Sequence, residues 1–296
     1  MKKLEGIVVN MLSPMEKDFS LDETSLVNLC DHYIKNKVGA IWALGSAGED
    51  FSLSLEYRKR FAKKISAYTS TKIPVILGIG NMSFDETVEF IDLNKENDFY
   101  GYHILLYDQK ISDQQAVRYV GKIADISDKP IWLYNNPKRG KLLSFQSVKE
   151  LSQHSNIQGI KVGGYNLTTI INSVSLENEN FQVMAAGGSQ LFPCLCLGYK
   201  IHSTSDANGF PVYMNSIFNA FKDGELKTSR DLQYEYIKMM KTFPSLVQMN
   251  GEKSVIEKYI CSLNGLCKEH ANASYTYLDE TSKKIIREKI KLFDLK

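Results

Sequence analysis

The sequence predicts an α/β protein in which eight strands close into a (β/α)8 barrel, the TIM-barrel architecture, followed by a C-terminal helical extension. Short apolar runs alternate with segments of helical periodicity, and most intervals between runs are roughly 20 to 35 residues, the length of a strand–helix unit. Eight such units occur in succession, whereas an open doubly wound sheet usually needs only about five to seven strands. The chain has 296 residues, enough for one closed barrel.

The eight apolar runs are the expected strands. Their nearly continuous apolar character suits strands that are buried on both faces, as in parallel sheets. The runs are Gly6–Leu12, Val38–Leu44, Ile73–Gly80, Gly101–Tyr107, Lys129–Asn135, Ile157–Gly163, Gln182–Gly188 and Gly198–Thr204.

Amphipathic helices are expected between and after these strands. Ser20 and Glu23 have the spacing of a capping box, which predicts the start of the first helix, extending to Tyr33. We expect a barrel over residues 1–224 and a helical extension of the same domain over residues 225–296. The other expected helices cover residues 53–65, 84–93, 115–126, 145–151, 167–174, 190–197, 214–221, 226–242, 253–263 and 280–292.

Charge and composition exclude several classes of function. The 36 basic and 34 acidic residues give a net charge of +2, without the basic patch of a nucleic-acid-binding protein. No apolar stretch approaches the roughly eighteen residues that span a membrane. Residues Met1–Gly6 include an acid and a glycine where a signal peptide needs an apolar run. We therefore expect a cytoplasmic protein with no nucleic-acid or membrane partner.

Metal binding is not expected from the cysteines and histidines. The histidines lack metal-ligand spacing, and His103 and His202 lie inside expected strands, where they are predicted to be packed. The cysteines are scattered and are predicted to be buried free thiols. They are Cys30, Cys194, Cys196, Cys261 and Cys267.

Lys161 is the strongest catalytic candidate. In a (β/α)8 barrel the active site lies at the C-terminal ends of the strands, and Lys161 lies near the end of the sixth expected strand, between Ile160 and Val162. Burial disfavours the charged form, and lowering the pKa from about 10.4 to near 7 takes roughly 4 kcal/mol. A neutral amine can form a Schiff base with a carbonyl substrate. The alternative is a lysine that extends to solvent or pairs with a carboxylate.

Three further features lie at the same barrel end. Tyr134 ends the fifth expected strand and can transfer protons, or it simply binds backbone there. The turn Gly45–Glu49, with its free amides and the Ser46 hydroxyl, suits a carboxylate, although it also fits an ordinary glycine-rich turn. Arg139 can bind a second carboxylate or lie exposed in its loop. Their placement at one barrel mouth favours the functional interpretation.

Three motifs in chain order resemble the dihydrodipicolinate synthase and N-acetylneuraminate lyase family of pyruvate-handling class I aldolases. The Gly-Thr/Ser-Thr-Gly-Glu turn of that family corresponds to Gly45–Glu49, its Tyr-Asn-x-Pro segment to Tyr134–Pro137, and its Gly-Ile-Lys strand to Gly159–Lys161. The resemblance covers nearly the whole chain.

The resemblance implies a role for each candidate. Lys161 would form a covalent imine with pyruvate or another 2-oxo acid, without any cofactor. Tyr134 would relay protons through Ser46 and Tyr107, a residue that in relatives reaches across a dimer interface. A homotetramer built as a dimer of dimers is expected. The substrate-binding candidates are Gly45, Ala47, Arg139, Gly187, Gly188, Ser189, Ser205 and Asn208, with the amides of Ser46 and Ala47 holding the carboxylate.

Departures from the family pattern bear on the substrate. Arg139 favours the synthase, in which an arginine binds aspartate semialdehyde, but Val162 and Gly163 replace the Glu-Ala that follows the synthase lysine. Ser189-Gln190 replaces the acidic pair of sialic acid lyases, and Ala47 replaces the second hydroxyl of the turn. The positions that bind feedback lysine in sensitive synthases hold side chains unsuited to that ligand, Leu55, Met82 and Leu106.

The expected function is therefore that of a class I aldolase. It cleaves a 2-keto-3-deoxy sugar acid to pyruvate and an aldehyde, or condenses these two to form the sugar acid. The alternatives are a dihydrodipicolinate synthase, which condenses pyruvate with aspartate semialdehyde, and an N-acetylneuraminate lyase. A catalytically silent barrel that binds a 2-oxo acid is a further alternative, against which the presence of both Lys161 and Tyr134 argues.

Overall fold

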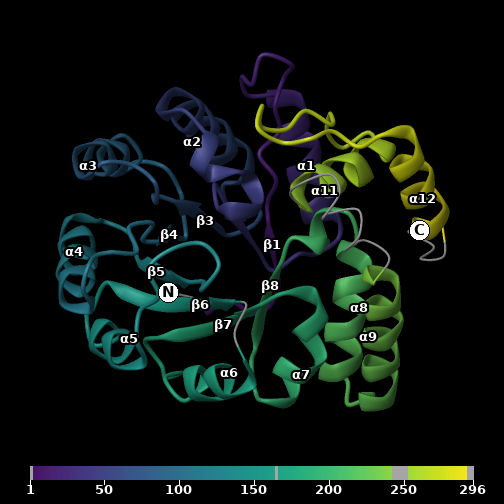
Figure 1. Ribbon diagram of the computed structural model, residues 1–296. Helices are drawn as coiled ribbons and strands as arrows, with labels where there is room; N and C mark the ends of the chain where they lie inside the picture. The colour runs from purple at the N-terminus through teal and green to yellow at the C-terminus, as the bar shows by residue number, and fades with distance from the viewer. Residues whose placement is uncertain (1–2, 164–165, 242–252, 292–296) are drawn as a thin grey trace.

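The computed structural model describes residues 3–163, 166–241 and 253–291. Eight parallel strands close into one barrel in sequence order, with β8 paired to β1, and helices surround them (Figure 1). The predicted (β/α)8 barrel is confirmed. Each strand lies inside its predicted run: β1 (Gly6–Asn10), β2 (Ala40–Ala43), β3 (Val75–Gly78), β4 (Gly101–Ile104), β5 (Ile131–Asn135), β6 (Ile157–Gly163), β7 (Gln182–Ala186) and β8 (Ile201–Thr204).

Every predicted helix is present within a few residues of its expected bounds. The barrel helices are α1 (Glu23–Lys35), α2 (Leu55–Thr69), α3 (Phe84–Leu93), α4 (Asp113–Ile126), α5 (Phe145–Leu151), α6 (Leu167–Val174), α7 (Leu191–Cys196) and α8 (Pro211–Lys222). The C-terminal helices are α9 (Leu226–Met240), α11 (Lys253–Leu263) and α12 (Glu280–Ile290). Short 3-10 turns are η1 (Ser46–Gly48), η2 (Asp50–Ser52), η3 (Gly188–Gln190) and η4 (Asp206–Asn208). The last residues of two expected helices, Thr242 and Leu292, lie outside the described residues.

The predicted capping box of the first helix is wrong. The N-cap of α1 is Asp22, whose carboxylate accepts a 3.0 Å hydrogen bond from the Ser25 amide. Ser20 instead belongs to a loop that an isolated bridge between Met15 and Leu21 closes, and its hydroxyl donates to Asp18. Because that loop holds Ser20 away from the helix, the helix begins two residues later than the motif predicts.

Side chains alternate between two apolar regions along β6. Ile160 and Val162 belong to the large cluster between the strands and the surrounding helices. Lys161 lies between them in sequence and therefore points the other way, into the barrel. It is in register with Tyr134 on β5 and Met184 on β7, both members of the smaller cluster inside the barrel. The strand thus directs a lysine into the barrel interior.

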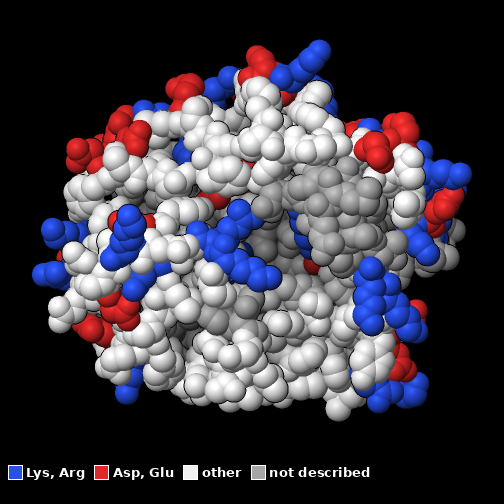
Figure 2. Space-filling model, viewed as in Figure 1, with Lys and Arg blue, Asp and Glu red and all other residues white. Residues whose placement is uncertain are grey.

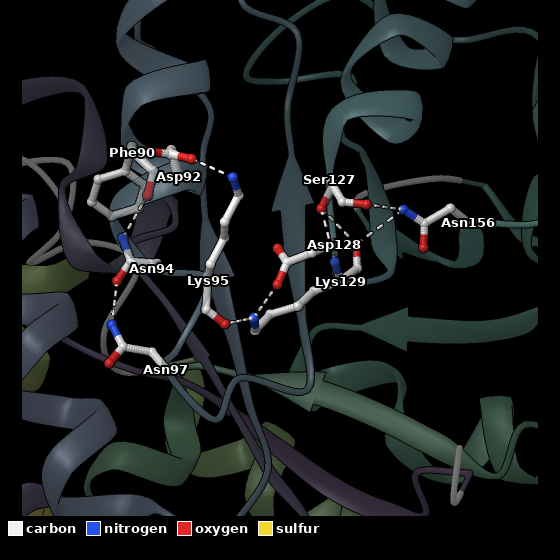
Figure 3. Close-up of polar contacts among 9 residues, drawn as sticks. All are labelled: Phe90, Asp92, Asn94, Lys95, Asn97, Ser127, Asp128, Lys129 and Asn156. Atoms are coloured by element: carbon white, nitrogen blue, oxygen red, sulfur yellow. Dashed lines mark hydrogen bonds and ion pairs between the residues drawn. The ribbon is translucent and has the colours of Figure 1, made fainter.

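A polar network ties together the loops that lead into β4, β5 and β6 (Figure 3). The Lys129 ammonium donates to the carbonyl of Lys95 at 2.7 Å and to the carboxylate of Asp128 at 2.6 Å. The Asn156 amide donates to the carbonyls of Ser127 and Lys129, at 2.8 and 3.2 Å. Loops that lead into the strands lie at the N-terminal end of the barrel, the end that serves stability in this fold. The network therefore fixes strands whose C-terminal ends carry the candidate site.

All five cysteines are free, and four are buried as predicted. Cys196, the last residue of α7, is exposed, and its predicted burial is wrong because α7 turns that side chain outward. Within the described ranges, no group of three or more potential ligands could hold a metal ion. None of the described helices is both long and apolar enough to cross a membrane.

Candidate active site

A cavity of about 730 Å³ opens at the C-terminal ends of the strands. Figure 2 shows the molecule hollowed near the centre of this face, with Lys and Arg side chains beside the hollow. Its volume falls within the usual range for small-molecule sites. It is lined by nine of the predicted site residues, namely Lys161, Tyr134, Ser46, Ala47, Arg139, Gly187, Gly188, Ser189 and Ser205.

The Lys161 amine is enclosed by the barrel. The residue is 2% exposed, and its Nζ lies 4.6 Å from the ring centroid of Trp42 and 4.4 Å from that of Tyr134. Nζ donates a 2.6 Å hydrogen bond to Oδ1 of Asn10, at the end of β1. Burial holds the pKa of Lys161 well below its usual value, although the charge of Asp50 opposes this shift. A larger neutral fraction of the amine is therefore available as a nucleophile.

The Tyr134 hydroxyl lies in a short polar chain beside Lys161. It is 3.3 Å from the Ser46 hydroxyl oxygen and accepts a 2.8 Å hydrogen bond from the Asn136 amide. Burial raises the pKa of Tyr134, while Ser46 and Asn136 oppose the shift. The phenol therefore keeps its proton at neutral pH and can both donate and accept one through Ser46.

The turn after β2 is held in place by the C-terminal extension. Its last residue, Glu49, has a left-handed backbone with φ of 60°, and its carboxylate forms a fully buried ion pair of 2.6 Å with Lys258 of α11. The other carboxylate oxygen accepts a 2.7 Å hydrogen bond from the Asn272 amide. Within the turn, the first backbone hydrogen bond is donated by Gly48 to Gly45. The amides of Ser46 and Ala47 are thus left out of the turn's own hydrogen bonds.

Two of the predicted residues, one in this turn and one beside it, do not line the cavity. Gly45 begins the turn, and a Cβ there would lie 3.0 Å from the Trp42 indole nitrogen, so the glycine allows close packing. Tyr107 donates its hydroxyl to the buried carboxylate of Asp50. The structure therefore brings the hydroxyl groups of Ser46 and Tyr134 together, as the expected proton relay requires, and within the chain Tyr107 is bonded to Asp50. The relay itself stays a prediction.

Asn208 was predicted to bind the substrate, but its side chain instead makes hydrogen bonds within the fold. It is fully buried and is not among the cavity-lining residues. Its Oδ1 accepts from the Tyr33 hydroxyl and the Leu12 amide, at 2.5 and 3.2 Å. Its Nδ2 donates to the carbonyls of Asn10 and Ser205, at 2.8 and 2.6 Å. Because these contacts use its whole amide, Asn208 connects the ends of β1 and β8 and has no group left for a ligand.

The structure adds site residues that the sequence did not reveal. Asn10 and Ser203 are bonded to one another at 2.5 Å, and Asn10 contacts the Lys161 amine. Asp50 is buried beside the turn, and Lys253 and Glu257 of α11 line the cavity. The available signal for Asn10 was a polar side chain inside an apolar run, close to the C-terminal end of the expected strand.

Comparison with known proteins identifies the family. The model of the Dihydrodipicolinate synthetase family matches residues 3–292. The chain belongs to this family. As a member of the Dihydrodipicolinate synthetase family, the protein is a carbon–carbon lyase of the aldolase type.

Relatives within the Dihydrodipicolinate synthetase family differ in their named activities. The chain is 27% identical over 295 residues to a 4-hydroxy-tetrahydrodipicolinate synthase of Neisseria meningitidis, covering 97% of this chain and 98% of the relative. It is 28% identical over 250 residues to a probable 2-dehydro-3-deoxy-D-pentonate aldolase of Escherichia coli, covering 81% of each. YagE, a prophage protein of this family from E. coli K12 whose structure is a complex with pyruvate, matches with a TM-score of 0.90 and 25% identity over 99% of both chains.

Proposed function

We propose that this protein is a Schiff-base-forming class I aldolase that cleaves a 2-keto-3-deoxy sugar acid reversibly between C3 and C4. The products are pyruvate and an aldehyde. The observation that carries the proposal is the Lys161 amine, which lies buried at the base of the cavity with a lowered pKa and with the Tyr134 ring beside it. A neutral lysine in an enclosed polar pocket is the group that attacks a keto carbon.

The first half of the proposed reaction forms the imine. Lys161 Nζ attacks C2 of the substrate, and the proton that the amine gives up passes to the former carbonyl oxygen. A second proton converts this oxygen into water, which leaves, and a protonated imine results. We expect Tyr134 and Ser46, whose hydroxyl oxygens lie 3.3 Å apart, to move these protons.

The second half breaks the carbon–carbon bond. The C4 hydroxyl loses its proton, the C3–C4 electron pair moves toward the imine nitrogen, and the aldehyde leaves an enamine on Lys161. The enamine takes up a proton at C3, and water then hydrolyses the imine to release pyruvate and the free amine. Because the imine accepts the electron pair, the proposed reaction uses no metal or cofactor.

The residues around the lysine favour a sugar acid as substrate. Val162 and Gly163 follow Lys161, and Ser189 and Ser205 line the cavity with hydroxyl groups that suit a hydroxylated substrate. A pentonate aldolase is among the relatives.

We also propose a homotetramer, as the family resemblance implies.

A synthase that condenses pyruvate with aspartate semialdehyde is the second candidate. The observation in its favour is Arg139, which lines the cavity on the loop after β5 and can bind a carboxylate. The relative from N. meningitidis carries the name of such a synthase.

Trapping with borohydride tests the proposal. Incubation with pyruvate and borohydride should add one reduced pyruvate unit to Lys161, located by peptide mass spectrometry. The variant Lys161→Met should show no adduct, and Lys222→Met, which removes an exposed lysine, should react like the wild type. Tyr134→Phe should still form some imine but turn over at least about 10²-fold more slowly. An unmodified wild-type protein would refute the mechanism.

Turnover with different substrates then selects between the two candidates. We expect cleavage of 2-keto-3-deoxy sugar acids, measured by coupling pyruvate release to lactate dehydrogenase, to exceed the condensation of pyruvate with aspartate semialdehyde. The reverse order would establish the synthase.

A further inference from the structure

A lysine and two carboxylates form a cluster in the cavity away from the strand that carries Lys161. Lys253, the first residue of α11, contacts Asp206 Oδ1 at 2.5 Å and Glu257 Oε1 at 3.1 Å. Its Nζ also lies 3.4 Å from the Ser205 hydroxyl. All four residues line the same cavity as Lys161.

The cluster is supported from behind, so its side chains are held in position. Thr204 donates a 2.6 Å hydrogen bond to Asp206 Oδ2. Gly188 completes the packing, because a Cβ there would lie 2.5 Å from the Tyr236 hydroxyl and 2.6 Å from Asp206 Oδ2. Asp206 is thereby occupied by Thr204 and Lys253, and it fixes the ammonium group of Lys253.

Glu257 and Lys253 both line the cavity, and the long 3.4 Å contact of the Lys253 ammonium with the Ser205 hydroxyl can be exchanged for a ligand hydroxyl. Glu257 is 5% exposed, and its Oε1 faces the Lys253 ammonium at 3.1 Å without a hydrogen bond of good geometry within the described part of the chain. Burial raises the pKa of Glu257, partly opposed by Lys253. Lys253 has a side chain that is 37% exposed. A buried acceptor that lacks a well-aligned donor is costly, and a ligand hydroxyl can supply one.

The charges of the cluster decide which ligand suits it. One ammonium facing two carboxylic groups carries no excess positive charge, so the cluster offers no favourable site for a second carboxylate or a phosphate. The ammonium group in turn disfavours a ligand amine. A neutral chain of hydroxyl groups fits both partners, because each hydroxyl donates to a carboxylate and accepts from an ammonium group.

We propose that Lys253 and Glu257 bind the hydroxyl groups of the aldehyde half of the substrate. This inference rests on the proposed function, in which pyruvate is bound covalently at Lys161 and the aldehyde lies farther out in the cavity. It assigns specificity for a hydroxylated aldehyde to the first turn of α11, a segment outside the (β/α)8 units.

Aldol addition with two three-carbon aldehydes tests the assignment. Glyceraldehyde carries two hydroxyl groups and propanal carries none, so kcat/KM for each with pyruvate reports the contribution of the hydroxyls. The wild type should prefer glyceraldehyde. Lys253→Met and Glu257→Gln should lower kcat/KM for glyceraldehyde roughly 10- to 100-fold, the effect of losing a hydrogen bond to a charged group. Their kcat/KM for propanal should change less than about twofold.

Two controls make the outcomes decisive. Lys222→Met removes a lysine from an exposed ion pair with Glu5 and should leave both aldehydes unaffected. Borohydride trapping of pyruvate should be unchanged in all variants, which shows that the barrel is folded and the imine site intact. Glu257→Gln keeps the shape of the side chain and serves if Lys253→Met fails to fold.

Three outcomes overturn the proposed subsite when borohydride trapping persists. The variants lose kcat/KM equally for both aldehydes, the variants keep the wild-type preference for glyceraldehyde, or the wild type itself shows no such preference. Absence of trapping in the wild type overturns the proposed function itself, and the subsite with it.

Discussion

Asn10 determines the immediate surroundings of the Lys161 amine. Its Oδ1 accepts from Lys161 Nζ at 2.6 Å and from the Ser203 hydroxyl at 2.5 Å. A neutral amide at this position orients the amine without adding a charge that would favour the ammonium form. Asn10 is therefore a positioning residue, and its neutrality is as relevant as its hydrogen bond.

Replacing Asn10 with Asp should raise the pKa of Lys161. A carboxylate next to the amine favours the ammonium form, and an adjacent opposite charge shifts a pKa by about one to three units. We expect the pH profile of imine formation, measured by borohydride trapping at a series of pH values, to move upward by that amount. In the wild type the profile should have its inflection well below 10.5, the usual lysine value, because burial lowers the pKa of Lys161.

Asn10→Ala is the matched control, since it removes the hydrogen bond but introduces no charge. Its turnover should fall while the inflection does not move upward. If the profiles of Asn10→Asp and the wild type coincide, Asn10 does not act on the amine in this way.

At the scale of the elements, α11 links the C-terminal extension to the turn after β2. The link is the ion pair of Lys258 with Glu49, in which both side chains are 0% exposed. Lys258 also donates to the carbonyl of His270 at 2.8 Å. The extension thus fixes the turn that carries Ser46 and Ala47.

Lys258→Met should destabilise the protein by about 3–5 kcal/mol, because it leaves the Glu49 carboxylate buried without its partner. Urea unfolding followed by circular dichroism measures this change. The double variant with Glu49→Gln should recover part of the loss, since no buried charge remains. Lys238→Met breaks the exposed pair with Glu235 and should cost less than about 1 kcal/mol. A similarly small loss in Lys258→Met would show that the buried pair does not stabilise the fold.

At the scale of the whole molecule, buried histidines inside the barrel make stability depend on pH. His202 is fully buried, with Nε2 at 2.8 Å from the carbonyl oxygen of Gly187, and burial lowers its pKa to about 4. His103 stacks on Trp42 with ring centroids 4.1 Å apart, and burial holds its pKa well below the usual value. Both are packed residues, as the sequence predicted.

The free energy of unfolding should fall as the pH drops from about 6.5 to about 4. In this window the unfolded chain protonates His202 while the folded barrel keeps it neutral, so acid favours unfolding by up to about 3 kcal/mol. Urea unfolding at several pH values measures the slope. His202→Gln should flatten it, whereas His154→Gln, at the surface beside Asp125, serves as the matched control. An equal slope in His202→Gln and the wild type would contradict this assignment.

The sequence alone was sufficient to predict the barrel and the two residues at the centre of the candidate site, Lys161 and Tyr134. Apolar runs alternating with amphipathic segments report burial directly, so the strands and helices were predictable. Lys161 and Tyr134 were also predictable, because strand periodicity and parallel pairing bring neighbouring strand ends together. The start of α1 was not, since the loop closed by Met15 and Leu21 overrides the local capping motif.

The contacts that complete the site were decided only by the tertiary structure. Asn10 reaches Lys161 across 151 positions of sequence because β8 pairs with β1 and closes the barrel. Lys253 meets Asp206 only because α11 folds back over the barrel mouth. Local periodicity specifies which face of an element is buried, whereas the identity of the facing side chain depends on how distant elements pack.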